Sequence, residues 1–205
     1  GSLEVVSGKR INARVANELE KQKNKSLEID FDNFLDQSKF DALSTKVAAS
    51  DSYNSNSVID KRDALWTETY TAVFDRLKEI GLYQTHFADS VKLFGYNQYR
   101  PANEAYGNIY GPHFDNGGYV FYIHPDWQES WAGQLQITNA VVEEYRTGIF
   151  PKPNRFVWID PKTYHNVTTV GSSISHCRVA NVAFLGGNIS IDPAGIDFIN
   201  ISTTT

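Results

Sequence analysis

The sequence predicts a mainly β fold, a sandwich or barrel, that is buttressed by N-terminal helices. Two observations predict it. The first ninety residues carry helical patterns, whereas the later segments are short, aromatic and β-branched and are separated by Gly, Pro and Asn. Because the helices precede the strands instead of alternating with them, a parallel α/β sheet is excluded. A length of 205 residues and a hydrophobic content of 41% suit a single domain, residues 1–205.

The first part of the chain, residues 1–90, is expected to be a mostly helical buttress. Helical patterns occur in residues 9–25, 39–49 and 63–80. The last of these is the strongest, and Gly81 follows it as a C-cap. Residues 27–31 alternate as a strand does, and residues 50–57, rich in Ser, Asn and Asp, predict a mobile loop.

The second part, residues 91–187, is expected to form the β core. Its strand-like segments are residues 91–99, 113–115, 119–124, 133–138, 155–160, 165–170 and 178–185. Residues 188–205 are polar and weakly patterned, which predicts an extended tail.

Composition and charge argue against two classes of partner, nucleic acids and membranes. The net charge is −5 and no basic stripe runs along the chain, so a nucleic-acid partner is not expected. No segment approaches the roughly 20 apolar residues of a membrane-spanning helix, so no membrane partner is expected either. The single cysteine, Cys177, cannot form an intrachain disulfide, which favours a reducing compartment, and we expect the cytoplasm.

Two of the five histidines begin a His-x-Asp triplet: His113-Phe114-Asp115 and His124-Pro125-Asp126. Alternate residues of a strand share a face, so His113 and Asp115 can hold one cation together. A histidine nitrogen with a carboxylate oxygen suits Fe(II), Mn(II) or Zn(II). In the second triplet the proline cannot donate to a strand ladder and Pro-Asp marks turns, so His124 is interpreted as structural.

His165 is the third candidate ligand. It opens the alternating run of residues 165–170, where an inward-pointing ring could meet His113 and Asp115. Two histidines and one carboxylate leave three coordination positions open, the arrangement of non-heme Fe(II) oxygenases. Taken alone, His165 is better interpreted as an ordinary histidine at a strand end.

An ordered series of motifs surrounds these residues. It runs Tyr99-Arg100-Pro101, Tyr110-Gly111-Pro112-His113-Phe114-Asp115, Val120-Phe121-Tyr122-Ile123-His124-Pro125-Asp126-Trp127, Trp131-Ala132-Gly133-Gln134-Leu135, Pro153-Asn154-Arg155-Phe156-Val157, His165-Asn166-Val167 and Arg178. In this order and spacing, from about Phe94 to Gly186, the sequence resembles the Fe(II)- and 2-oxoglutarate-dependent dioxygenases, closest to their prolyl 4-hydroxylase-like branch.

The resemblance implies a double-stranded β-helix, that is, a jelly-roll of two antiparallel sheets buttressed by α-helices. It implies Fe(II), bound by His113, Asp115 and His165, with 2-oxoglutarate and O2 as cosubstrates and ascorbate as a reductant. It further implies that Arg178 holds the far carboxylate of 2-oxoglutarate. By the same resemblance Tyr99 and Tyr122 lie beside that carboxylate, and Tyr110 and Phe184 lie on the substrate side.

The residue that holds the far carboxylate has a rival. His176 lies two positions before Arg178 and would share its strand face. Arginine is always charged and presents a planar fork, whereas a buried histidine near pH 7 is largely neutral, so Arg178 is preferred. The interval from His165 to Arg178, an insert at residues 103–107, and Ala132-Gly133-Gln134-Leu135 in place of the usual Gly-Gly-Glu-Leu depart from the family pattern.

The resemblance predicts a hydroxylase that acts on a prolyl or other peptide residue and releases succinate and CO2. A free amino acid or a small metabolite is the alternative substrate. Two other classes stay open: a non-enzymatic, cupin-like jelly-roll that senses a ligand through its metal, and a zinc or manganese enzyme of cupin type.

Overall fold

The computed structural model of the chain describes residues 4–6, 9–11, 30–85, 87–96, 113–114, 117–138, 141, 146–159 and 163–184. The helices are α2 (Gln37–Ala48), α3 (Ala64–Glu79), α4 (Phe87–Ser90) and the 3-10 turns η1 (Asp51–Tyr53) and η2 (Glu129–Trp131). The strands are β1 (Glu4–Val6), β2 (Lys9–Ile11), β3 (Asp30–Phe31), β4 (Ser57–Ile59), β5 (Lys92–Tyr96), β6 (Gly118–Tyr122), β7 (Leu135–Thr138), β8 (Arg146–Ile149), β9 (Phe156–Ile159), β10 (His165–Val167) and β11 (Arg178–Phe184).

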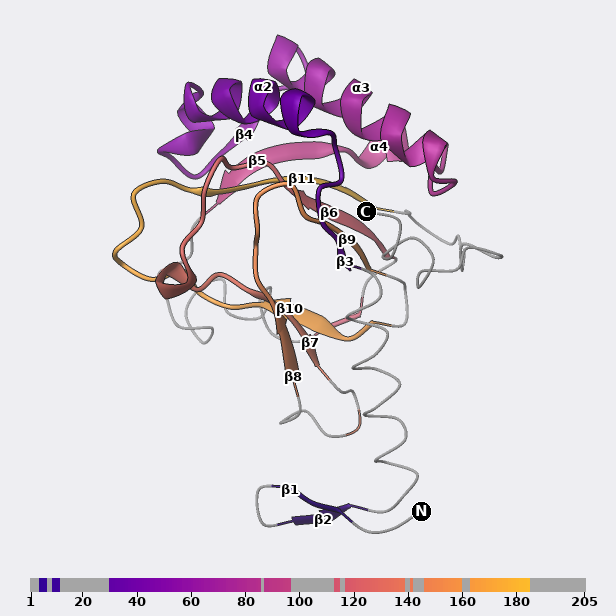
Figure 1. Ribbon diagram of the computed structural model, residues 1–205, viewed down its shortest axis with the longest axis vertical. Coiled ribbons are helices and arrows are strands. Elements are labelled where there is room, and N and C mark those ends of the chain that lie inside the picture. Colours follow the sequence, from indigo (N-terminus) through magenta and orange to yellow (C-terminus); the bar gives the residue numbers. More distant parts are fainter. Residues whose placement is uncertain are drawn as a thin grey trace.

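The larger sheet has the strand order β3-β9-β6-β11-β5-β4, and every neighbouring pair is antiparallel. Its outer face is covered by α2, α3 and α4, which lie on one side of the molecule (Figure 1). Aromatic side chains join the two layers: Phe121 of β6 packs against Phe34 and Phe40, and Phe87 of α4 packs against Tyr119 and Trp158. The odd-numbered residues of β6 therefore face the helices.

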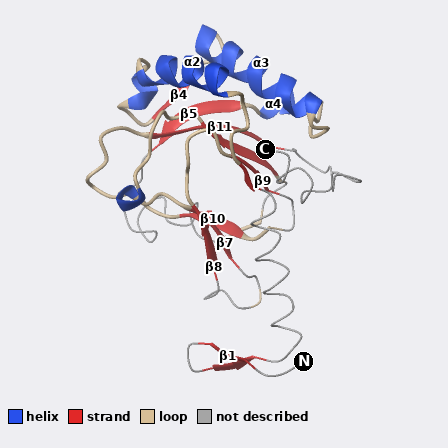
Figure 2. Cartoon of the chain, viewed as in Figure 1, coloured by secondary structure: helices blue, strands red, loops and turns tan. Residues whose placement is uncertain are grey.

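The smaller sheet has the order β10-β7-β8 and faces the uncovered side of the larger one (Figure 2). In its register Leu135 pairs with both Ile149 and Val167, and Ile137 pairs with His165. Leu135, Ile137 and Ile149 are buried in the same core as Tyr122 and Val157, so this face looks into the space between the sheets. The predicted jelly-roll of two antiparallel sheets, buttressed by helices, is confirmed.

The two long helices begin and end where the sequence predicts. Asp36 and Asp63 are the N-caps of α2 and α3, and each side chain accepts a backbone N–H bond from the first turn. After α3, Gly81 adopts a φ of 77° and the Leu82 N–H donates to the Leu77 carbonyl. This is the Schellman motif, a helix C-terminus that favours glycine. The predicted helices at residues 39–49 and 63–80 and the Gly81 cap are confirmed.

Several local predictions are wrong. Residues 9–11 form strand β2 in a hairpin with β1, not the start of a helix, and residues 12–29, with most of that helix and most of the strand predicted at 27–31, lie outside the described residues. The buttress also contributes β3 and β4 to the larger sheet, so it is less purely helical than predicted. β4, β8 and α4 were not predicted, because they are short and lack a strong period.

Residues 50–57 form the turn η1 and the start of β4, and part of the segment is held against the larger sheet although several of its residues are exposed; the mobility expected of it stays a prediction. Ser52 is buried, and its carbonyl oxygen lies only 1.8 Å from where a Cβ on Gly95 would stand. The Cys177 N–H donates to the Tyr53 carbonyl at 2.6 Å. Glycine at position 95 thus lets this polar segment dock on β5, a contact that composition alone does not reveal.

The predicted tail, residues 188–205, and the insert at 103–107 lie outside the described residues. No helix in the described part of the chain is long and apolar enough to cross a membrane.

Candidate metal and cosubstrate site

His113 and His165 lie side by side at the edge of the smaller sheet. The two residues form an isolated antiparallel bridge, in which the His113 N–H donates to the His165 carbonyl at 2.9 Å and the reverse bond is 3.0 Å long. Directly opposed residues of an antiparallel pair point to the same side. The ring centroids are 4.6 Å apart, and because His165 is in register with buried Ile137, the pair belongs to the inner face.

The ring of His165 is oriented by its own loop. Its Nδ1 lies 2.8 Å from the Thr163 carbonyl oxygen, which can only accept a hydrogen bond, and the side chain is buried. In the neutral ring this contact assigns the proton to Nδ1 and leaves Nε2 as the nitrogen that can coordinate a metal. A backbone carbonyl that fixes the tautomer in this way is the usual support of a metal-binding histidine.

The third predicted ligand, Asp115, lies outside the described residues. Within the described ranges, no group of three His, Cys, Asp or Glu side chains is close enough to hold a metal ion. Phe114, between the two triplet ends, is 52% exposed and packs against Tyr164, the residue before His165. The structure thus brings together two of the three predicted ligands, and an aromatic pair joins the segments that carry them.

Arg178 reaches from the larger sheet to the smaller one. It begins β11, where Ala180 pairs with Tyr122, so that Arg178, Ala180 and Tyr122 share the face opposite to the helices. Its Nη1 donates to the carbonyl of Gly133, just before β7, at 2.6 Å, and the residue is 8% exposed. A guanidinium buried to this degree is costly unless its charge is compensated, which is the setting of an anion-binding arginine.

Gly133 is a site residue that sequence reasoning missed. Its φ is 73°, and a Cβ added to it would lie 2.9 Å from Val170 Cγ1 and 3.3 Å from Trp127 Cζ2. Only glycine therefore fits where the chain passes beneath Arg178. The available signal was a glycine at the first position of a predicted strand, in the stretch noted above for its departure from the family pattern.

The other predicted site residues are distributed as follows. Tyr122 is buried on the inner face. Tyr99 and Tyr110 lie outside the described residues. Phe184 is 38% exposed at the end of β11 that is remote from Arg178, and its backbone N–H donates to Ser90 Oγ. Its expected role on the substrate side stays a prediction.

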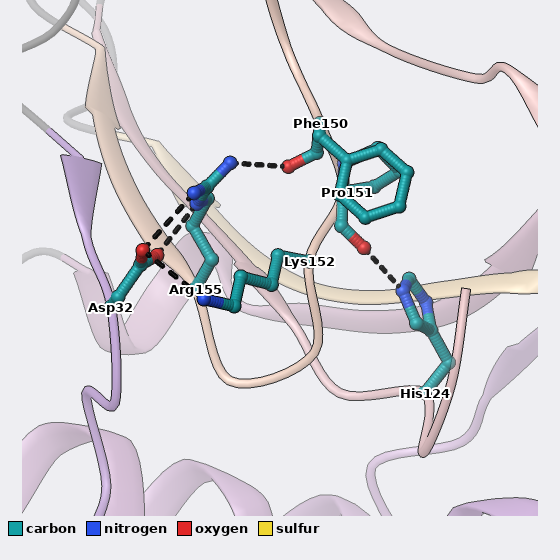
Figure 3. Close-up of polar contacts among 6 residues, drawn as sticks. All are labelled: Asp32, His124, Phe150, Pro151, Lys152 and Arg155. Carbon is teal, nitrogen blue, oxygen red and sulfur yellow. Dashed lines mark hydrogen bonds and ion pairs between the residues drawn. The ribbon is translucent and has the colours of Figure 1, made fainter. Parts of the chain in front are cut away.

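His124 has the structural role that the sequence predicts. The ring is fully buried, and Nε2 donates to the Pro151 carbonyl at 2.7 Å (Figure 3). Nδ1 accepts the Val179 N–H at 3.1 Å. Burial, the largest cause, lowers the pKa of His124 to about 3. With both nitrogens engaged by the backbone, this histidine serves the fold and not a metal.

The loop that His124 holds is fixed from its other side by ion pairs. Arg155 donates to both carboxylate oxygens of Asp32 and to the Phe150 carbonyl, and Lys152 lies 3.6 Å from the same carboxylate (Figure 3). The hydrogen bond from Arg155 holds the pKa of Asp32 below its usual value. This loop leads from β8 into β9, so the contacts keep the strands of the two sheets in place.

His176, the rival to Arg178, is engaged elsewhere. Its Nε2 lies 3.0 Å from Asp126 Oδ1 and its Nδ1 lies 2.8 Å from the Cys177 carbonyl oxygen. Asp126, the acidic end of the second triplet, therefore binds His176 and not its triplet partner His124. These contacts leave Arg178 as the stronger candidate of the two.

A groove of about 660 Å³ lies on the helical layer between α3 and the segment that leads into α2, where Thr71 and Asp75 form part of its lining. It belongs to the outer face, so the helices and the larger sheet separate it from the histidine pair. We do not assign the groove to the site.

A search of solved structures returned prolyl hydroxylases, the branch that the sequence resembles. A Pseudomonas putida prolyl-4-hydroxylase is 16% identical with a TM-score of 0.48, over 83% of this chain and 97% of that one. A Trichoplax adhaerens prolyl hydroxylase, solved with a hypoxia inducible factor peptide fragment, is 13% identical with a TM-score of 0.45, over 85% and 93%.

A third match is a prolyl 4-hydroxylase from Phytophthora capsici, 16% identical with a TM-score of 0.48, over 94% of this chain and 70% of that one. No family model matches the sequence, and the comparison with curated proteins found no match. Likenesses this distant concern the fold alone, and the architecture stands on the strand order and register given above.

Proposed function

We propose that the protein is an Fe(II)- and 2-oxoglutarate-dependent dioxygenase that hydroxylates an unactivated C–H bond. The observation that carries the proposal is a single interior, between two antiparallel sheets, toward which both the His113–His165 pair and buried Arg178 are directed. Paired histidines and a buried cation facing one interior are what a metal and an anionic cosubstrate require.

The donor set fits the metal. His165 presents Nε2, the ring of His113 lies beside it, and we propose Asp115 as the third ligand. Bound iron would supply the activation of O2 that oxidises the substrate C–H bond while 2-oxoglutarate is converted to succinate and CO2. The protein's own part is to orient the His165 ring through Thr163 and to hold the two ligand segments together through their backbone bridge.

The spacing along β7 supports Arg178 as the group that binds the far carboxylate. The histidine pair stands opposite Ile137, whereas Arg178 contacts Gly133, four residues earlier, which is about 13 Å of extended chain. The histidine pair and the guanidinium thus lie at separate points along one side of the interior, as an anion chelated at one end and bound at its far carboxylate requires. We propose Tyr122, on the same inner face, as a phenol beside that carboxylate.

The proposed substrate is a prolyl or other peptide residue, as the sequence resemblance implies, with a free amino acid or small metabolite as the alternative. Tyr99, Tyr110 and Phe184 keep their predicted roles in this proposal, and ascorbate is the proposed reductant. The assays below therefore cover peptide and amino-acid pools.

The first test is the anaerobic addition of Fe(II) and 2-oxoglutarate. We expect a visible charge-transfer band, which His113→Ala and His165→Ala abolish because each removes a metal ligand. Arg178→Ala should keep its iron affinity but lose roughly 2–5 kcal/mol of 2-oxoglutarate binding, as expected when one partner of a buried charge pair is removed.

The matched control is Arg62→Ala. This arginine is exposed and pairs with Asp60, so its loss should leave both affinities unchanged. The second readout is succinate release in air with peptide and amino-acid pools. Wild-type protein that gives neither the band nor succinate would overturn the proposed function and favour the cupin-like alternatives.

A further inference from the structure

Residues 126–133, within the connection from β6 to β7, lie against the start of β11, where Arg178 stands. This segment is tied to the start of β11 at both of its own ends. Asp126 bonds to His176 at 3.0 Å, and the Gly133 carbonyl accepts from Arg178 at 2.6 Å. The position of the Arg178 guanidinium therefore depends on how this segment is held.

Trp127 holds the last turn of the segment. Its Nε1–H donates to the Ala132 carbonyl at 2.8 Å, and its ring edge lies 3.3 Å from where a Cβ on Gly133 would stand. Ala132 has φ 54° and ψ −133°, a conformation that costs free energy for a residue with a Cβ and persists only when the surroundings impose it. The Trp127 hydrogen bond is one such constraint, applied one residue before the carbonyl that binds Arg178.

The ring of His176 packs against the ring of Trp127. The centroids of these two rings are 5.7 Å apart and their planes make an angle of 70°. His176 is also stacked on Tyr53, with a centroid distance of 4.2 Å and an interplanar angle of 12°. The two polar contacts of His176, to the Asp126 carboxylate and the Cys177 carbonyl, fix the orientation of its ring. Burial and the Asp126 carboxylate raise the pKa of Tyr53 to about 12, so its hydroxyl stays protonated beside Asp126.

We propose that Trp127 is a positioning residue for the cosubstrate anchor. It fixes the Ala132–Gly133 turn and thereby the Arg178 guanidinium, and His176, held by Asp126, keeps the Trp127 ring in place. The affinity for a dicarboxylate then depends on an aromatic cluster outside the interior. This inference rests on the proposed function, because the dicarboxylate is 2-oxoglutarate.

The test compares two tryptophans of the cluster. Trp127→Phe keeps an aromatic ring but removes the bond to Ala132, whereas Trp131→Phe is the matched control, because Trp131 also contacts His176 but makes no such bond to the turn. We measure 2-oxoglutarate binding anaerobically with Fe(II) by titrating the visible band. Trp127→Phe should raise the dissociation constant for 2-oxoglutarate about fivefold, as the loss of one hydrogen bond implies. Trp131→Phe should change this constant less than twofold.

A second ligand separates positioning from general loosening of the fold. 2-Oxopentanoate has the same chain length but a methyl group in place of the far carboxylate, so Arg178 cannot bind it as an anion. Trp127→Phe should lower the ratio of the affinity for 2-oxoglutarate to the affinity for 2-oxopentanoate about fivefold. The affinity for Fe(II) should stay unchanged. In an Arg178→Ala background the same substitution should change 2-oxoglutarate binding less than twofold, because the two residues act through one contact.

Asp126→Asn keeps the test decisive if Trp127→Phe folds poorly, because Asp126 is largely exposed and its amide alters only the contacts to His176 and to the Tyr53 hydroxyl. It should weaken 2-oxoglutarate binding in the same direction, by about twofold to threefold. Equal effects of Trp127→Phe and Trp131→Phe, or an unchanged ligand preference, would overturn the inference while the proposed function stands. Wild-type protein that binds no 2-oxoglutarate would overturn both.

Discussion

Gly133 combines three roles in one residue. Its left-handed backbone conformation turns the chain into β7, its missing side chain leaves room for Val170 and Trp127, and its carbonyl accepts a hydrogen bond from Arg178. Gly81 shares only the first of these roles, because nothing lies within 4 Å of where its Cβ would be. The two glycines therefore allow backbone strain to be separated from crowding.

Replacing each glycine with alanine should give different losses of stability. Gly81→Ala should lower the free energy of unfolding by about 1 kcal/mol, from strain alone. Gly133→Ala should cost about 1–3 kcal/mol more, because Val170 and Trp127 must shift. Urea denaturation of the two variants measures the difference, and equal losses would mean that the packing around Gly133 yields without cost.

His124 makes stability depend on pH. Its pKa is about 3 in the folded protein, against an ordinary value of 6.5, because burial disfavours the charged ring. Above pH 6.5 the ring is neutral in both states. As the pH falls toward 3, the unfolded chain binds a proton that the folded chain does not, so the free energy of unfolding falls across this window.

The expected slope is at most about 1.4 kcal/mol per pH unit, the value for one proton. His124→Asn should flatten it between pH 6.5 and 5, where few carboxyl groups titrate, because the amide cannot be protonated there but can still accept the Val179 N–H. Stability curves in urea over this pH range measure the effect. Parallel slopes for the two proteins would show that His124 is not the group responsible.

At the scale of elements, Asn154 fastens the segment before α2 to the larger sheet. Its side chain accepts from the Leu35 N–H at 3.0 Å and donates to the Leu35 carbonyl at 2.8 Å. Its own carbonyl accepts the Phe34 N–H, and its N–H donates to the Tyr122 carbonyl. One asparagine at φ 65° thus links the helical layer, the start of β9 and the end of β6.

Asn154→Ala should lower the free energy of unfolding by about 2–4 kcal/mol, because two buried hydrogen bonds are lost and the Leu35 backbone groups lose their partners. Asn154→Gly removes the same bonds without the strain that alanine suffers at positive φ, so its loss should be smaller. Exposed Asn54→Ala is the control and should change little. Chemical denaturation gives the free energy of unfolding of all three variants. A negligible loss of stability in both Asn154 variants would show that Asn154 does not fasten this segment to the sheet.

At the scale of the whole molecule, the sequence predicted the layers well because period and order are properties of long stretches. α3 carries an unbroken apolar face, its cap residues Asp63 and Gly81 are unambiguous, and β11 is a run of seven residues. Helices before strands then leave one arrangement, a β core covered on one side. The family resemblance implied that His113 and His165 converge, whereas their positions in the predicted strands only allowed it.

The remainder could not be predicted because it depends on contacts between distant segments. The docking of residues 50–57 depends on Gly95, and the turn that holds Arg178 depends on Trp127 and Val170. Each of these pairs is separated by tens of residues or lies in a turn whose shape local propensity does not determine. The separate engagement of Asp126 by His176, away from its triplet partner, belongs to the same class.

The backbone bridge between His113 and His165 has a thermodynamic consequence. It closes a loop of about fifty residues, and the conformational entropy of that closure is lost when the smaller sheet forms, whether or not a metal is present. A cation that binds there meets two imidazoles already brought together, whereas the unfolded chain offers no such pair. By mass action, the supply of metal would then set how much of the chain is folded as well as how much of it is loaded.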